Sequence, residues 1–330
     1  MSMTRITRSA LLRGGAALLA MPAMAQGQEA AFPNQPIRMI VGYAPGGNTD
    51  VPARLFSTEL ARILGQPVVV ENRPGASGVP AGQFVQRSRP DGHMLLWATS
   101  ASHSVSVVAM APLAYDPVKD FSPITLISLD PNVIVSGPAF PAQNLPELLA
   151  HLRANAGTPI GTSGPATSGR FAAELMRPKL GIQLTPVPYR STGPMLTDLA
   201  SNQLPLGIMG ASTAVPFLRD GRLRAYGVTS LARSRILPEV PTFHETASPG
   251  FEAVAWSALY GPPGMAPAVV EKIGAAMREA AAVPGVRKWL EESGLLVPLG
   301  SPAELVGFME ADIAKWVGVA RENNLRFEGQ

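Results

Sequence analysis

Cysteine is absent from this 330-residue chain. Without thiols the protein has no disulfide, no thiolate ligand for a metal, no cysteine nucleophile and no cysteine to carry a lipid. Histidine is rare as well, and no two of the four histidines stand four residues apart, the spacing that places two metal ligands on one helix face. We therefore expect no metal site.

Familiar catalytic and cofactor motifs are also missing. The sequence has no phosphate-binding Gly-Lys-Ser/Thr loop and no Gly-x-Gly-x-x-Gly. Residues 161–165 read Gly-Thr-Ser-Gly-Pro and come close to the Gly-x-Ser-x-Gly of hydrolases, but Pro165 replaces the second glycine. Ser102 beside His103 resembles half of a nucleophile–base pair, yet adjacent residues rarely have that geometry, so a pocket or loop histidine is the better interpretation. We expect no enzyme and no cofactor; a hydrolase using the Ser163 turn is the weaker alternative.

No apolar run reaches the ~20 residues needed to span a bilayer. A short apolar run at residues 14–21 follows three arginines, and residues 23–25 read Ala-Met-Ala, the small-x-small pattern of a cleavage site. The pattern predicts a signal peptide over residues 1–25, cleaved after Ala25, and a mature protein in the periplasm.

Neither positive nor negative charge is in excess once this leader is removed. The whole chain has 27 Lys+Arg and 24 Asp+Glu, and residues 1–25 hold three arginines and no acid, which leaves 24 of each sign. The basic character therefore belongs to the leader, and we expect no nucleic-acid partner.

Strand-like and helix-like segments alternate along the chain, the pattern typical of an α/β fold with largely parallel sheets. About 300 mature residues exceed one compact core of ordinary size. We predict a two-lobed α/β protein, each lobe a mostly parallel sheet flanked by helices. Residues 32–130 with 252–330 form the first lobe and 131–251 the second, with a ligand in the cleft between them. Asp130-Pro131 is the expected first crossing, between strands at 124–129 and 133–136.

Four turns follow predicted strands and precede predicted helices, the place where open α/β sheets bind ligands. The first is Pro-Gly-Gly-Asn-Thr-Asp at 45–50, with Asp50 expected as a helix N-cap. The others lie at 99–104, 162–170 and 189–193 and are rich in hydroxyls and glycine. Backbone N–H groups and hydroxyls at helix starts suit a carboxylate. The Ser and Thr residues can instead be N-caps, an interpretation that is equally good for Thr167 and Ser168 and compatible with ligand binding. The candidate ligand-binding residues are Gly46, Gly47, Asp50, Thr99, Ser100, Ser163, Gly164, Thr167, Ser168, Arg170, Tyr189 and Ser191.

Several longer stretches carry a resemblance to a known family. They include Glu-Asn-Arg-Pro-Gly-Ala at 71–76, Tyr-Asp-Pro-Val-Lys-Asp-Phe at 115–121 and Pro-Glu-Val-Pro-Thr at 238–242, in order across nearly the whole mature chain. The chain resembles the tripartite tricarboxylate transporter substrate-binding proteins, the Bordetella uptake gene family.

The resemblance implies a type II-like periplasmic binding protein that closes on a small carboxylate and delivers it to membrane permease subunits. We also expect the mature protein to be a monomer. It carries ligand-binding roles onto the first turn, onto Thr99 and Ser100, and onto the turn at 163–168. Two departures stand out: Gly169-Arg170 replaces a usual His, and Met209-Gly210-Ala211 lacks a usual acid. Arg170 is therefore expected either to face the cleft and pair with a ligand carboxylate or to face solvent. Transport and ligand sensing for a receptor use the same pocket, so the sensing role stays open as an alternative.

Overall fold

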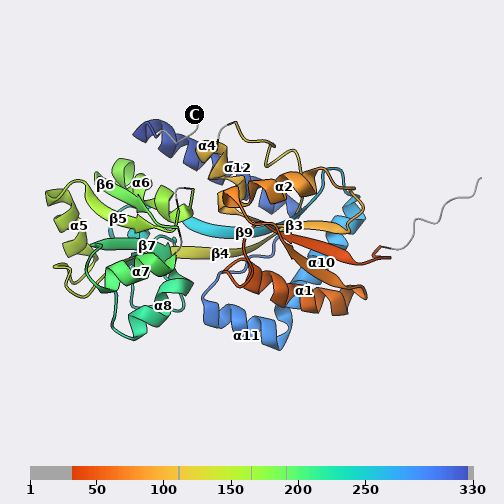
Figure 1. Ribbon diagram of the computed structural model, residues 1–330, viewed down its shortest axis with the longest axis horizontal. Helices are drawn as coiled ribbons and strands as arrows, with labels where there is room; N and C mark the ends of the chain where they lie inside the picture. Colours follow the sequence, from red (N-terminus) through yellow and green to blue (C-terminus); the bar gives the residue numbers. More distant parts are fainter. Residues whose placement is uncertain (1–31, 111, 165, 191, 326–330) are drawn as a thin grey trace, which may run out of the picture. The chain divides into compact units, whose positions relative to one another are not determined.

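The computed structural model describes residues 32–110, 112–164, 166–190 and 192–325. The predicted signal peptide and Ser191 lie outside these described residues. The described part of the chain forms a mixed α/β fold, as the sequence predicts (Figure 1).

The described residues form one hydrogen-bonded sheet of nine strands in the order β2-β1-β3-β9-β4-β7-β5-β6, with β8 also paired to β4. The strands are β1 (Ile37–Val41), β2 (Val68–Asn72), β3 (Met94–Thr99), β4 (Ser122–Ser136), β5 (Thr158–Thr162), β6 (Leu184–Pro188), β7 (Leu206–Gly210), β8 (Arg224–Val228) and β9 (Val254–Gly261). The β1–β2, β1–β3, β5–β6 and β5–β7 pairs are parallel. The pairings made by β4 and β9 are antiparallel.

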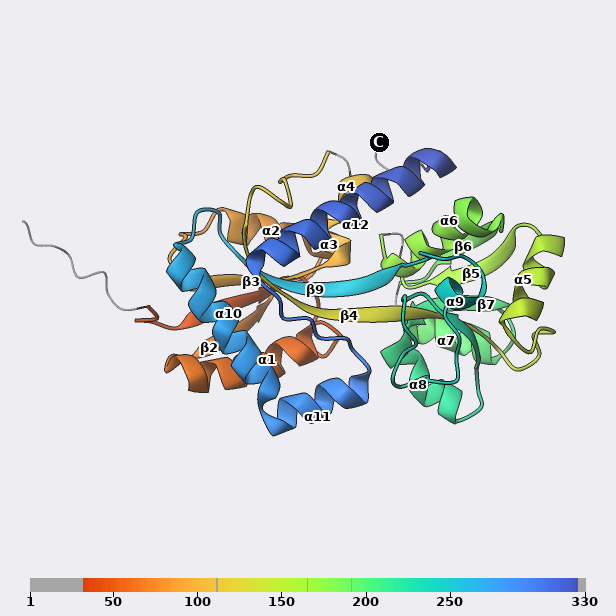
Figure 2. The same ribbon diagram turned by 180° about the vertical axis from the view of Figure 1, so that it is seen from behind.

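The long strand β4 connects two groups of strands. The first group is β2, β1, β3 and β9, and the second is β7, β5, β6 and β8. Residues 122–131 pair with β9, and residues 132–136 pair with β7 and β8 (Figures 1 and 2). The sequence predicts two strands here, whereas the structure has one. Pro131 is tolerated because it is the last residue paired with β9, and the next residue pairs with β7, so no ladder is broken in its middle.

Helices cover both faces of the sheet. They are α1 (Asp50–Leu64), the 3-10 turn η1 (Ala76–Gly78), α2 (Val79–Gln86), α3 (Ser100–His103), α4 (Ser106–Ala109), α5 (Leu145–Ala154), α6 (Ser168–Leu180), α7 (Thr192–Ala200), α8 (Ala211–Arg219), α9 (Phe243–Thr246), α10 (Pro267–Ala282), α11 (Pro284–Ser293) and α12 (Pro302–Asn323). Among the described residues, every helix is too short or too polar to cross a membrane.

Strand β1 shows why this sheet needs helices on both faces. Its residues read Ile-Arg-Met-Ile-Val, and Met39 and Ile40, which point to opposite faces, are both fully buried. Met39 packs in a cluster with α1 and α10, and Ile40 packs in another cluster with α2 and α12 (Figure 1). The continuous apolar run is therefore the sequence signature of this two-sided burial.

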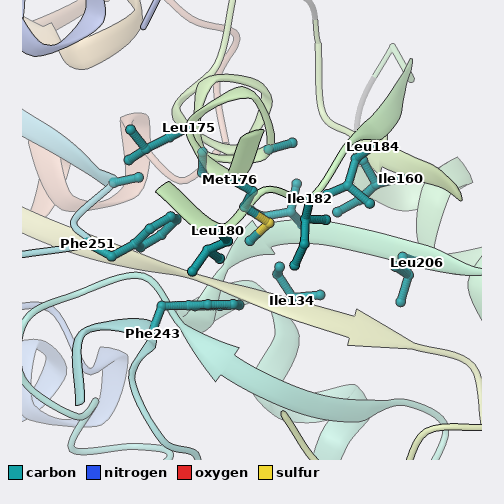
Figure 3. Close-up of a cluster of buried hydrophobic side chains, with 14 of the residues drawn as sticks. Ile134, Ile160, Leu175, Met176, Leu180, Ile182, Leu184, Leu206, Phe243 and Phe251 are labelled. Carbon is teal, nitrogen blue, oxygen red and sulfur yellow. The ribbon is translucent and has the colours of Figure 1, made fainter. Parts of the chain in front are cut away.

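A second core lies around β5, β6 and β7, under α5 and α6. Ile134 from β4 meets Ile160, Met176 and Leu206 there, with Phe243 and Phe251 at its margin (Figure 3). Helix α12 contacts both β4 and α6. This long helix therefore packs on the strand that the two groups share and on a helix of the second core.

Residues next to the helix ends explain where two of these helices end and begin. Gly65 takes a left-handed φ of 72° and its N–H bonds the carbonyl of Ala61, which terminates α1. Asn144 caps α5 because its side-chain oxygen accepts the Glu147 N–H at 3.0 Å. Glycine after the last helical residue and asparagine before the first are the residue types that favour these two positions.

Candidate functional site

A cavity of about 210 Å³ lies where the carboxyl ends of strands meet the amino ends of helices. Its described lining comes from the turn after β1, the β3–α3 junction, the middle of β4, the turn after β5, the start of α8 and the middle of β9. The lining residues are Tyr43, Asn48, Thr49, Pro52, Thr99, Ser100, Ala101, Ser128, Asp130, Asn132, Ser163, Thr167, Ser168, Gly169, Thr192, Gly210, Thr213, Ala255, Trp256, Ser257 and Leu295. The cavity thus forms at the kind of place where open α/β sheets bind ligands.

Five of the candidate ligand-binding residues line this cavity: Thr99, Ser100, Ser163, Thr167 and Ser168. Gly46, Gly47, Asp50, Gly164, Arg170 and Tyr189 are not among its described lining residues. In the first turn the lining is supplied by Asn48 and Thr49 instead of the neighbouring glycines. The turns therefore meet as expected, but their cavity-facing residues are partly different ones.

Asp50 holds the first turn in shape. Its carboxylate accepts the Gly46 N–H at 2.8 Å, the Asn72 side-chain amide at 2.7 Å and the Arg54 Nε–H at 2.8 Å. Burial alone would raise the pKa of Asp50, but the hydrogen bonds from Arg54, Gly46 and Asn72 outweigh it and lower the pKa to about 2. The N-cap position is Thr49, so the prediction of Asp50 as N-cap is wrong: Asp50 is the first helical residue, and its side chain folds back on the turn.

The first turn also reaches α8 directly. The Asn48 side-chain amide donates to the Thr213 hydroxyl at 2.9 Å, and both residues line the cavity. This hydrogen bond joins the β1–α1 turn to a helix that follows β7.

At the β3–α3 junction, Thr99 and Ser102 form a capping box. The Thr99 hydroxyl also bonds the Tyr43 hydroxyl at 2.8 Å, which places two polar groups at the cavity wall. Ser100 follows with its hydroxyl unbonded to any described residue.

His103 is neither a pocket nor a loop histidine, so that interpretation is wrong. It is fully buried, its ring stacks on Tyr260 at 4.9 Å, and its Nδ1 lies 3.0 Å from the Ser102 hydroxyl. Burial lowers its pKa to about 3, so the ring is neutral at ordinary pH. Neither Ser102 nor His103 lines the cavity, and the pair therefore belongs to the core.

The turn after β5 uses its hydroxyls in two ways. Thr167 caps α6 by accepting the Arg170 N–H at 3.3 Å, and Ser168 bonds the Asn132 side chain at 3.3 Å. Ser163 makes no hydrogen bond to a described residue and faces the cavity. The two roles expected for this turn, cap and lining, are therefore shared among its residues.

Arg170 and Tyr189 have partners of their own. The Arg170 guanidinium pairs with Glu174 one turn along α6 at 2.6 Å, with a side chain 22% exposed. The Tyr189 hydroxyl donates to Asp198 at 2.7 Å. Both assignments as ligand-binding residues stay predictions.

Asp130 is the most informative residue that sequence reasoning missed at the site. It stands in β4 immediately before the change of partner strand, and its carboxylate accepts the Ser212 hydroxyl at 3.1 Å. Burial raises its pKa to about 6, although hydrogen bonds from Ser212 act in the opposite direction. The signal in the sequence was a lone acid inside an otherwise apolar and hydroxyl-bearing run, at 122–136.

Gly210 makes room for that carboxylate. A Cβ at this position would collide with Asp130 Oδ2, so any other residue would push the acid away. The missing acid at 209–211 therefore does not leave the cavity without one, because Asp130 from the neighbouring strand supplies it.

The electrostatics of the cavity follow from this lining. Asp130 is the one ionisable side chain besides Tyr43 among the described lining residues, and no Lys, Arg or His joins it there. Within residues 32–325, apart from 111, 165 and 191, no group of three or more His, Asp or Glu could hold a metal ion. The cavity can hydrogen-bond a polar ligand, but its described residues offer no paired nucleophile and base.

Comparisons with known proteins show to which family the chain is related. Residues 52–325 match the sequence profile of the tripartite tricarboxylate transporter family receptor. The chain is 31% identical to protein BugT of Bordetella pertussis, over 90% of this chain and 92% of that protein.

Two solved structures extend the similarity to the fold. MatC from Rhodopseudomonas palustris with bound malate is 33% identical, with a TM-score of 0.76 over 87% of this chain and 99% of that one. The periplasmic binding protein BugD is 28% identical, with a TM-score of 0.77 over 90% of this chain and all (100%) of that one. The predicted fold class, a two-lobed α/β periplasmic binding protein, is confirmed. The expected mostly parallel sheet in each lobe is not, because the described strands form one continuous mixed sheet in which β4 and β9 pair antiparallel with their neighbours.

Proposed function

Because the chain belongs to the tripartite tricarboxylate transporter receptor family, we propose that it captures a small organic acid in the periplasm and passes it to the membrane subunits of such a transporter. The observation that carries the proposal is the cavity at the meeting of the predicted turns. Its wall is built from hydroxyls, amide groups and helix amino ends, and it contains no described nucleophile–base pair.

The free hydroxyls in the wall supply the contacts that a carboxylate needs. Ser100, Ser128, Ser163 and Ser257 line the cavity, and their hydroxyls make no hydrogen bond to a described residue. Each can donate to a carboxylate oxygen once the water of the cavity is displaced. The amino end of α6 adds partial positive charge, worth ~0.3–1 kcal/mol toward an anion and more where the site is partly buried. This mode of binding holds an anion reversibly without a buried cation.

We propose that residues 32–130 with 252–330 act as one lobe and residues 131–251 as the other. Strands β4 and β9 connect them, and the Asn48–Thr213 hydrogen bond is one contact that closure makes across the cavity. Ligand binding then stabilises the closed arrangement because both lobes contribute to the wall.

We further propose export with cleavage after Ala25 and a monomeric mature protein that works with permease subunits and without turnover of its ligand. Sensing for a receptor would use the same cavity. The transport role is preferred because the family to which the chain belongs is that of transporter receptors.

Titration calorimetry tests the proposal. We expect saturable one-to-one binding of at least one acid from a panel of mono-, di- and tricarboxylates and amino acids, and at least tenfold weaker binding of its neutral amide. Mass spectrometry of the mixture after incubation checks that the ligand is unchanged. Absence of binding across the panel, equal affinity for acid and amide, or conversion of the ligand would contradict the proposal.

A further inference from the structure

Asp130 places a carboxylate in the wall of a cavity whose proposed ligand is itself an acid. The residue is partly exposed toward the cavity and otherwise enclosed by protein. No ion pair with Asp130 exists among the described residues, whereas Asp50 at the first turn is matched by Arg54. The described wall therefore leaves one negative charge without a positive partner.

Asp130 has a structural role, but that role does not use up its carboxylate. It bonds Ser212 at the amino end of α8, where the N-cap residue Gly210 offers no side chain. Ser212 bonds the carboxylate through its hydroxyl, at Oδ2, and through its backbone N–H, which leaves about two of the roughly four acceptor positions of the carboxylate for a ligand. An asparagine or serine would cap the helix as well without a charge, so capping alone does not call for an acid.

An unpaired carboxylate discriminates among acids. A ligand that carries only carboxylates is repelled by Asp130, whereas a ligand that also carries a protonated nitrogen gains a charge-assisted hydrogen bond. The other wall groups, hydroxyls and amides, are neutral and cannot make this distinction.

We propose that Asp130 is a specificity-determining residue that selects an amino-bearing acid, with the ligand's ammonium nitrogen at Asp130 and its carboxylate at the hydroxyl-rich turns. The inference rests on the proposed function and narrows it to a zwitterionic class of ligand. Gly210 supports this role of Asp130 because any larger residue there would displace the carboxylate.

The environment of Asp130 makes this role sensitive to pH. Ala255 in β9, Gly210 in β7 and Ser212 in α8 lie beside it and carry no titratable side chain, and Tyr43 is the one other titratable residue among the described lining residues of the cavity. Burial holds the pKa near 6, so the carboxylate is largely ionised at pH 7.5 and largely protonated at pH 5. An amino-bearing acid should therefore bind more tightly at the higher pH.

Calorimetry with matched pairs tests the inference. The pairs are aspartate with succinate, glutamate with glutarate, and 4-aminobutyrate with butyrate, each differing by one amino group. We expect at least one amino compound to bind the wild-type protein at least tenfold more tightly than its partner at pH 7.5. Asp130→Asn should remove that preference, because the amide keeps a hydrogen-bond acceptor for Ser212 but not the charge.

Asp220→Asn is the matched control, since Asp220 is exposed at the end of α8 and pairs with Arg222 outside the cavity. It should keep the full preference. If plain acids bind as tightly as, or more tightly than, their amino partners, the inference is overturned and the proposed function stands. If the preference survives in a folded Asp130→Asn protein, the inference is also overturned. If no compound of either kind binds, the inference is overturned, and the proposed function fails as well only if the wider panel of acids also shows no binding.

Discussion

Replacing Asp130 with asparagine should change how the stability of the empty protein depends on pH. The structure raises the pKa of this carboxyl from 3.8 to about 6, mainly by burial. Between these two values the folded protein holds a proton that the unfolded chain has released. The free energy of unfolding therefore falls as the pH rises from about 4 to about 6, and this loss persists above pH 6.

The size of the loss follows from the change in pKa. Each unit of pKa is worth about 1.36 kcal/mol, so a rise of roughly two corresponds to ~3 kcal/mol as an upper value. Water in the cavity reaches part of Asp130 and screens its charge, so we expect a loss of about 1–3 kcal/mol.

Urea denaturation of wild type and Asp130→Asn at pH 4.0, 5.0, 6.0 and 7.5 measures the effect as a difference. Groups such as Asp50 and His103 titrate in both proteins and cancel. The variant should gain about 1–3 kcal/mol relative to wild type between the lowest and the highest pH. A difference that stays constant over this range would refute the conclusion that the fold raises the pKa of Asp130. Asp220→Asn, altered at an exposed position, should show no such trend.

Three further substitutions separate the parts of the site. Asp50→Ala removes the shared acceptor of the first turn, so urea denaturation should show a loss of about 2–4 kcal/mol, with acid binding weakened more than tenfold. Asn48→Ala breaks the contact with Thr213, and stopped-flow measurements should show ligand dissociation accelerated by roughly threefold, with stability changed by less than about 1 kcal/mol. Arg170→Gln leaves Glu174 without its ion pair, so stability should fall by about 1–2 kcal/mol while calorimetry shows affinities within about twofold of wild type. A tenfold loss of affinity for dicarboxylates in that variant would instead assign Arg170 to the ligand.

Features of this structure that depend only on residues close together in the sequence were predictable. Glycine at the end of α1, asparagine at the start of α5 and the apolar run of β1 each act within a few residues, so their consequences can be derived without a fold. Within each group of strands the meeting of the hydroxyl-rich turns was predictable as well, since β1 and β3, and β5 and β6, are parallel pairs whose carboxyl ends lie side by side. That the two groups run in opposite directions and face each other across β4 was not predictable, because it depends on the antiparallel pairings of β4 and β9.

What could not be predicted depends on contacts distant in sequence. Asp130 enters the cavity wall only because β4 changes partner from β9 to β7 beside it, and Gly210 matters only because it lies next to that carboxylate. The rotation of a helix about its axis decides which of its residues line the cavity, and the sequence does not give it. Gly169 lines the cavity, whereas the side chain of Arg170, the next residue, runs along α6 to Glu174. His103 shows the same limit, because the aromatic rings that bury it come from Tyr115, Phe121 and Tyr260.

A crystal structure of the mature protein loaded with the tightest-binding acid of the panel would show directly whether the cavity holds the ligand. We expect one ligand molecule in the cavity, with its carboxylate within hydrogen-bond distance of the hydroxyl-bearing turns at Ser100 and Ser163 and its nitrogen at Asp130. A ligand seated elsewhere, for example against α10 and α11, or a carboxylate placed away from both turns, would contradict this expectation.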